Sequence, residues 1–141
     1  MTLLNLEVHL RVVGVFLIML AGMHVFLPRR FSWSTELARL SLLNRQIFIV
    51  HTLFIVLVLV LTGLLSLGFA PLLVQHTPLA TILLCGLAIF WWARMAAQLF
   101  IYSPKLWRGN RFNTAAHVLF SCLWLYFASV YTQTGPSGCR P

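Results

Sequence analysis

Acidic side chains are almost absent from this sequence. Its 141 residues include two glutamates, Glu7 and Glu36, and no aspartate. A carboxylate-bridged di-iron site needs several glutamates inside a helix bundle, and a Ser-His-Asp triad needs an aspartate. A carboxylate proton relay needs an acid within the membrane, and both glutamates lie outside the long apolar runs. The sequence therefore argues against these three functions.

Cysteine is also scarce. The three cysteines show neither a C-x-x-C motif nor zinc-ligand spacing, which argues against a zinc module. Cys85 and Cys122 fall at different depths of their apolar runs, so we expect packing residues rather than a disulfide between them. Cys139, in a tail rich in glycine and proline, is expected to be free or to pair with another chain.

Charge is low and hydrophobicity is high. Charged residues make up 9% of the chain and hydrophobic residues 60%. Soluble domains are typically about 25% charged and about 45–50% apolar. A soluble protein of this length could not bury so much apolar surface, so the composition indicates an integral membrane protein.

Four apolar runs are each long enough to form a transmembrane helix, which takes roughly 20 residues. They cover residues 10–28, 47–70, 79–102 and 114–133. We expect an all-α, four-helix transmembrane bundle that forms a single membrane domain over residues 1–141. The segments NRQIFIVH and SPKLWRGNRFNTAAH resemble those of small four-helix membrane proteins of bacteria, a likeness that concerns fold class alone.

Basic residues predict the orientation. The connection between the first two runs holds four of them and the connection between the last two holds three, whereas residues 71–78 hold none. The positive-inside rule places both basic connections in the cytoplasm. Both termini then lie on the non-cytoplasmic side, and we expect a multi-pass protein of the cell inner membrane.

The net charge of +8 lies mostly in these two connections. It predicts contact with anionic lipid head groups rather than with nucleic acid, because no nucleic-acid-binding motif accompanies it. Residues 34–45 form either a short amphipathic helix on the inner membrane surface or an irregular basic loop. The sequence leaves these two alternatives open.

Small residues at helical spacing predict close contacts between helices. Gly86, Ala93 and Ala97 form such a small-residue face on the third expected helix, and we expect a neighbouring helix to approach closely there. On the first expected helix Gly14, Ala21 and His24 lie roughly along one side, so the polar side chains of these helices can face a shared interior.

Polar side chains recur near the cytoplasmic end of every expected helix. Arg94, Gln98 and Tyr102 are four residues apart and share one helix face. Ionisable residues inside a membrane are candidates for a functional site. We therefore predict one level of polar side chains at similar depth near the cytoplasmic face, which consists of His24, His51, Arg94, Gln98, Tyr102 and His117. By contrast, His9 and His76 fall near the outer interface and are expected to be solvated.

Three cofactors fit this level chemically. Haem b could take two axial histidines from His24, His51 and His117, with Arg94 on a propionate. A quinone head group needs a histidine and a Gln98 or Tyr102 donor, and chlorophyll needs one histidine on magnesium. The cofactor-binding candidates are His24, His51, His117, Arg94, Gln98 and Tyr102, and the metal-ligating candidates are the same three histidines.

The leading hypothesis is a small membrane subunit of a larger redox or energy-converting complex, non-catalytic by itself. No segment is long enough to form a soluble domain that delivers electrons, so we expect other membrane subunits as partners. The first alternative is a structural accessory protein whose polar groups serve helix packing. The second is a self-standing membrane enzyme or lipid-handling protein with a histidine-based metal site.

Overall fold

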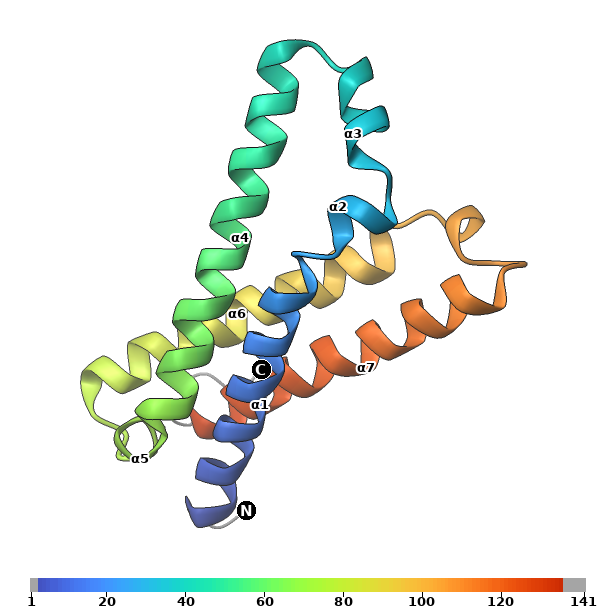
Figure 1. Ribbon diagram of the computed structural model, residues 1–141. Helices are drawn as coiled ribbons and strands as arrows, with labels where there is room; N and C mark the ends of the chain where they lie inside the picture. Colours follow the sequence, from blue (N-terminus) through green and yellow to red (C-terminus); the bar gives the residue numbers. More distant parts are fainter. Residues whose placement is uncertain (1–2, 136–141) are drawn as a thin grey trace. The chain divides into compact units, whose positions relative to one another are not determined.

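The computed structural model describes residues 3–135, and all the regular secondary structure in that range is helical (Figure 1). Four helices in this part of the chain are long and apolar enough to cross a membrane, namely α1 from Asn5, α4, α6 and α7. The prediction of an all-α protein with four such helices is therefore confirmed. In chain order the elements are α1 (Leu3–Met23), α2 (Leu27–Arg30), α3 (Trp33–Glu36), the 3₁₀ helix η1 (Leu37–Arg39), α4 (Leu42–Gly68), α5 (Ala70–Leu73), α6 (Pro78–Phe100), the 3₁₀ helix η2 (Pro104–Leu106) and α7 (Arg111–Thr134).

Helix α1 lies earlier in the chain than the first apolar run predicts. It ends at Met23, and a turn over residues 24–26 leads into α2, which has Pro28 in its first turn. Proline has no N–H to continue a helix, and it restricts the residue before it. The shift places Glu7 inside a helix that could span the membrane. The expectation that both acids lie outside such helices is therefore wrong for Glu7.

Three of the long helices begin at a side chain that caps them. The oxygens of Ser41, Thr77 and Asn110 each accept from the main-chain N–H three residues later, at 3.4, 3.2 and 3.2 Å. Such caps satisfy N–H groups that have no partner within the helix. Pro78 follows the Thr77 cap, where its missing N–H costs nothing. These signals fix where α4, α6 and α7 begin.

The segment expected to lie on the inner membrane surface is divided into short pieces. It contains the end of α3, all of η1 and the first turn of α4. Leu40 and Ser41 separate η1 from α4, because both have extended backbone, with ψ of 155° and 153°. Trp33 contacts Phe48 of α4 edge to face, at 4.8 Å between ring centroids. Residues 34–45 thus do not form one continuous helix.

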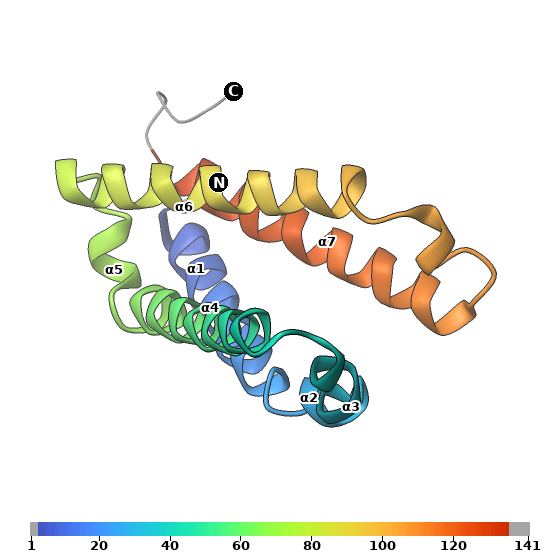
Figure 2. The same cartoon turned by 90° about the horizontal axis from the view of Figure 1, so that it is seen from above.

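The chain divides into two compact units, and the first contains residues 1–10 and 71–141. In this unit α6 and α7 run antiparallel and side by side (Figure 2). Trp91 of α6 stacks on Trp124 of α7 at 5.2 Å and meets Phe127 edge to face at 4.8 Å. Trp92 donates to the Thr132 hydroxyl at 3.1 Å. Aromatic packing around Trp91 therefore joins the middle of α6 to α7.

In the second unit, residues 11–70, helices α1 and α4 approach closely at two glycines. A Cβ on Gly14 would lie 2.6 Å from Leu67 Cγ and 2.8 Å from the carbonyl oxygen of Gly63. The sequence did not predict this close contact at Gly14. A Cβ on Gly86 would meet nothing within 4 Å among the described residues, so the close approach expected there is not found.

The cysteines differ from each other. Cys122 is free and exposed, so it does not pair with Cys85, as expected. Cys85 is disulfide-bonded, which corrects its interpretation as a free packing residue. Cys139 lies outside the described residues.

Replacing Gly14 with alanine should destabilise the protein by about 1–3 kcal/mol, because the new methyl group has no room against the Gly63 backbone. The free energy of unfolding can be measured by SDS titration from mixed micelles. Gly86→Ala is the matched control and should be neutral or stabilising by up to about 1 kcal/mol. Equal destabilisation by both substitutions would show that α1 and α4 do not meet at Gly14.

Candidate functional site: a polar cluster between α6 and α7

Arg94, Gln98 and His117 form a hydrogen-bonded chain between α6 and α7. Arg94 Nη1 donates to Gln98 Oε1 at 3.2 Å, and Gln98 Nε2 lies 3.0 Å from His117 Nδ1. Trp124 Nε1 donates to the same Gln98 oxygen at 3.3 Å. Gln98 is only 6% exposed, whereas Arg94 and His117 are half-buried. Gln98 is therefore the buried centre of the cluster.

The two donors that meet on Gln98 fix the orientation of its amide. A guanidinium and an indole N–H can only donate hydrogen bonds, so the atom they share must be the amide oxygen. The other end of the amide is then the NH₂ group, and it donates to His117 Nδ1.

The amide orientation in turn fixes the proton on His117. Its Nδ1 accepts a hydrogen bond, so the ring is neutral and carries its proton on Nε2. In an imidazolium, or in the other neutral tautomer, Nδ1 would carry a hydrogen. Two donors, Nδ1–H and the Gln98 NH₂, would then face each other. In this state His117 offers an N–H donor, whereas a metal ligand needs the bare lone pair of Nε2.

Trp107 lies flat on the His117 ring. The centroids are 4.5 Å apart and the planes differ by 8°. The hydroxyl of Thr114 donates to the carbonyl oxygen of Trp107 at 2.6 Å, and this bond ties the connection between α6 and α7 to the first turn of α7. The indole nitrogen of Trp107 is buried and has no hydrogen-bond partner in the part of the chain that the structure describes.

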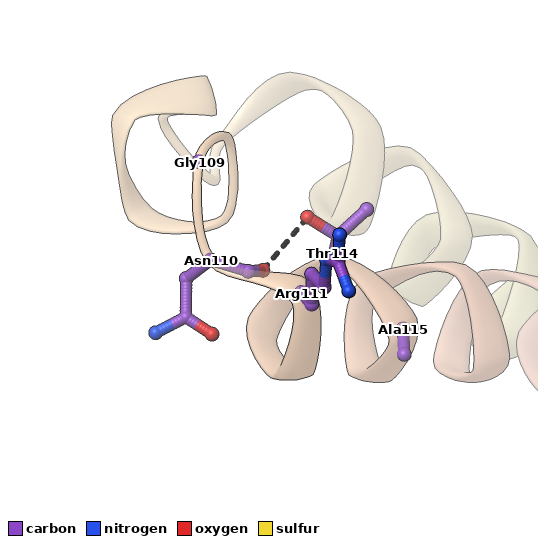
Figure 3. Close-up of a pocket in the computed structure, with 5 residues that line it drawn as sticks. All are labelled: Gly109, Asn110, Arg111, Thr114 and Ala115. Carbon is purple, nitrogen blue, oxygen red and sulfur yellow. Dashed lines mark hydrogen bonds between the residues drawn. The ribbon is translucent and has the colours of Figure 1, made fainter.

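A cavity of about 400 Å³ lies beside this turn (Figure 3). Thr114 also contacts the Asn110 carbonyl oxygen, at 2.9 Å. Gly109 has φ of +87°, a left-handed conformation that favours glycine. The turn therefore depends on Gly109 and is held by Thr114, which places Trp107 against His117. The cavity is lined by Gly109, Asn110, Arg111, Thr114 and Ala115.

Arg94 is held by aromatic rings and an amide rather than by an acid. Its guanidinium carbon lies 4.8 Å from the Trp124 ring centroid and 5.8 Å from that of Tyr102. Cation–π contacts of this kind are worth about 0.5–2 kcal/mol. No carboxylate of the described residues pairs with it, and Gln98 accepts one of its N–H groups. The remaining N–H groups are available to a ligand.

His24 and His51, in the other unit, carry the opposite tautomer. Their Nδ1 atoms lie 2.7 and 2.9 Å from the carbonyl oxygens of Leu20 and Ile47, each one turn earlier in the chain. A carbonyl only accepts, so each Nδ1 is protonated, and in the neutral ring Nε2 then has a free lone pair. This state suits a metal ligand. Among the described residues neither unit groups three His, Cys, Asp or Glu side chains that could hold a metal ion.

The structure thus brings together four of the six predicted site residues, Arg94, Gln98, Tyr102 and His117, in one unit. A site that also contains His24 and His51 stays a prediction. Neither Trp107 nor Trp124 is among the site residues predicted from the sequence. The spacing of seven residues from His117 to Trp124 places both on one helix face and could have indicated Trp124.

The chain defines an all-helical protein with four helices that suit a multi-pass membrane protein. Comparison with protein-family models, with curated proteins and with solved structures finds no match.

Gln98→Leu should lower the free energy of unfolding by about 1–3 kcal/mol, because it leaves buried donors of Arg94 and Trp124 without a partner. SDS titration measures the change. Gln46→Leu, at an exposed position of α4, is the control and should change stability by less than about 0.5 kcal/mol. A Gln98→Leu variant as stable as the control would contradict the network.

Proposed function

We propose that this chain is a small, non-catalytic membrane subunit of a redox complex, and that the α6–α7 cluster binds the head group of a quinone. The observation that supports this most is the excess of donors in the cluster. Gln98 Oε1 already accepts from Arg94 and Trp124. Among the described residues, His117 Nε2–H, further Arg94 N–H groups and the Trp107 indole N–H have no hydrogen-bond partner. Such a set suits a ligand that accepts hydrogen bonds.

A quinone carbonyl is an acceptor without a donor, so it fits this set. His117 Nε2–H and an Arg94 N–H would donate to carbonyl oxygen, and the charge on Arg94 would favour a head group that gains negative charge. The ring of Tyr102, which lies beside Arg94 and is exposed, offers apolar surface to a flat ring. Haem or chlorophyll fits His117 less well. Either would need a bare Nε2, which requires His117 and Gln98 to exchange donor and acceptor roles.

The proposal includes an orientation in the inner membrane. Both basic connections face the cytoplasm, and both termini lie on the other side. The disulfide at Cys85 supports this orientation, because disulfides form in oxidising compartments. Cys85 lies two turns from Pro78, near the connection without basic residues. The cluster then lies toward the cytoplasmic side, where Arg108 and Arg111 can meet anionic lipids and other subunits can deliver electrons.

A structural role is the second candidate, and one observation favours it. Both polar atoms of the Gln98 amide are used within the α6–α7 pair. Interhelical hydrogen bonds of this kind stabilise membrane helices by about 0.6–2 kcal/mol. In that case the cluster joins two helices of an accessory protein and binds no cofactor.

Quinone titration separates the two candidates. A short-chain ubiquinone analogue should quench the fluorescence of Trp107 and Trp124 saturably in protein reconstituted into nanodiscs. Arg94→Gln should weaken the apparent affinity about tenfold or more, since a hydrogen bond to a charged group contributes about 1.5–3 kcal/mol. His117→Phe should weaken it as well, because it removes the Nε2–H donor.

Arg39→Gln removes an exposed charge from η1 and serves as the matched control, with affinity expected to equal that of the wild type. Equal affinity in the Arg94→Gln and wild-type proteins would exclude the proposed site. A visible haem or chlorophyll spectrum that disappears in His117→Ala would show instead that His117 ligates a metal.

A further inference from the structure

A second polar site lies on α7, away from the cluster. Tyr126, Ser129 and Gln133 recur at spacings of three and four, so they share one face of the helix. They line a cavity of about 120 Å³ together with residues from the start of α1, which belongs to the same unit. The described residues that line it are Leu6, His9, Tyr126, Ser129, Val130 and Gln133.

His9 and Tyr126 are paired at this cavity. His9 Nδ1 lies 2.9 Å from the Tyr126 hydroxyl, and the rings meet edge to face at 5.9 Å. The sequence-based expectation that His9 is solvated is therefore wrong. One hydrogen atom lies between the two groups, and it belongs either to the Tyr126 hydroxyl or to His9 Nδ1.

Each position of this proton leaves the pair with one donor and one acceptor. If Tyr126 donates to His9, the histidine keeps an Nε2–H and the tyrosine oxygen can still accept. If His9 donates to Tyr126, the hydroxyl hydrogen is free and Nε2 can accept. The pair thus always complements a group that both donates and accepts, as a hydroxyl does.

The size of the cavity restricts the ligand. An engineered cavity of about 150 Å³ holds a benzene ring, so about 120 Å³ is room for a single small ring. Polar side chains that face a cavity within a membrane helix are costly unless they have partners. The lining supplies His9, Tyr126, Ser129 and Gln133 as such polar groups, with Leu6 and Val130 as apolar walls.

We propose that this cavity binds a single aromatic ring that carries a hydroxyl group, a ligand of the phenol or hydroquinone class. The site is separate from the α6–α7 cluster, since Tyr126 and His117 lie about 14 Å apart along α7 at 1.5 Å per residue. It does not depend on the quinone proposal, and either can fail without the other.

The test uses 4-fluorophenol as the probe and the full chain in nanodiscs. The ¹⁹F NMR signal should show saturable binding beyond that to empty nanodiscs. Tyr126→Phe keeps the ring and removes the hydroxyl, and it should weaken binding about tenfold. Ser129→Leu fills the cavity and should abolish binding. Arg39→Gln, at an exposed position of η1 outside both sites, is the control and should bind as the wild type does.

A second probe, 4-fluorotoluene, has a ring of similar size but no hydroxyl, and it should bind about tenfold more weakly than 4-fluorophenol. Equal binding of the two probes would overturn the proposal. So would wild-type binding in both Tyr126→Phe and Ser129→Leu, or a loss in Arg94→Gln alone, which would assign the probe to the α6–α7 cluster. An absence of saturable binding to the wild type would overturn it too.

Discussion

The shared oxygen of Gln98 is the constraint on which the α6–α7 cluster depends. Arg94 and Trp124 can only donate, and both donate to this one buried atom. The amide must therefore point its NH₂ group at His117, and His117 must hold its proton on Nε2. The guanidinium of Arg94 on α6 thus orients the Gln98 amide, and the amide determines that His117 on α7 can offer a ligand an Nε2–H donor.

The surrounding packing holds this network in place. Trp124 stacks on Trp91 while its indole nitrogen donates to Gln98, so one side chain joins the aromatic core to the polar cluster. Trp107 covers the His117 ring. Removing part of the aromatic core should therefore disturb the proton position on His117 as well as stability. The permanent charge of Arg94 has aromatic partners but no acidic one among the described residues, which leaves it available to an electron-rich guest.

Much of the fold follows from the sequence, because apolar length and helical spacing are local properties. Four runs of sufficient length predict four spanning helices, and spacings of four place Arg94, Gln98 and Tyr102 on one face. The sequence did not predict where α1 ends or that Glu7 lies inside this helix, because both depend on the turn that the chain makes before Pro28. The sequence could not predict which ring nitrogen of each histidine carries the proton. They depend on partners from a second helix for His117, and on main-chain carbonyls for His24 and His51.

Nitrogen NMR of histidine tests the central claim most directly. In protein labelled with ¹⁵N-histidine, and assigned with single His→Gln variants, the two ring nitrogens of each neutral imidazole give distinct shifts. His117 should show a protonated Nε2 and an unprotonated Nδ1, whereas His24 and His51 should show the reverse. A protonated Nδ1 on His117 would contradict the orientation of Gln98 and the donor role from which the quinone site is inferred.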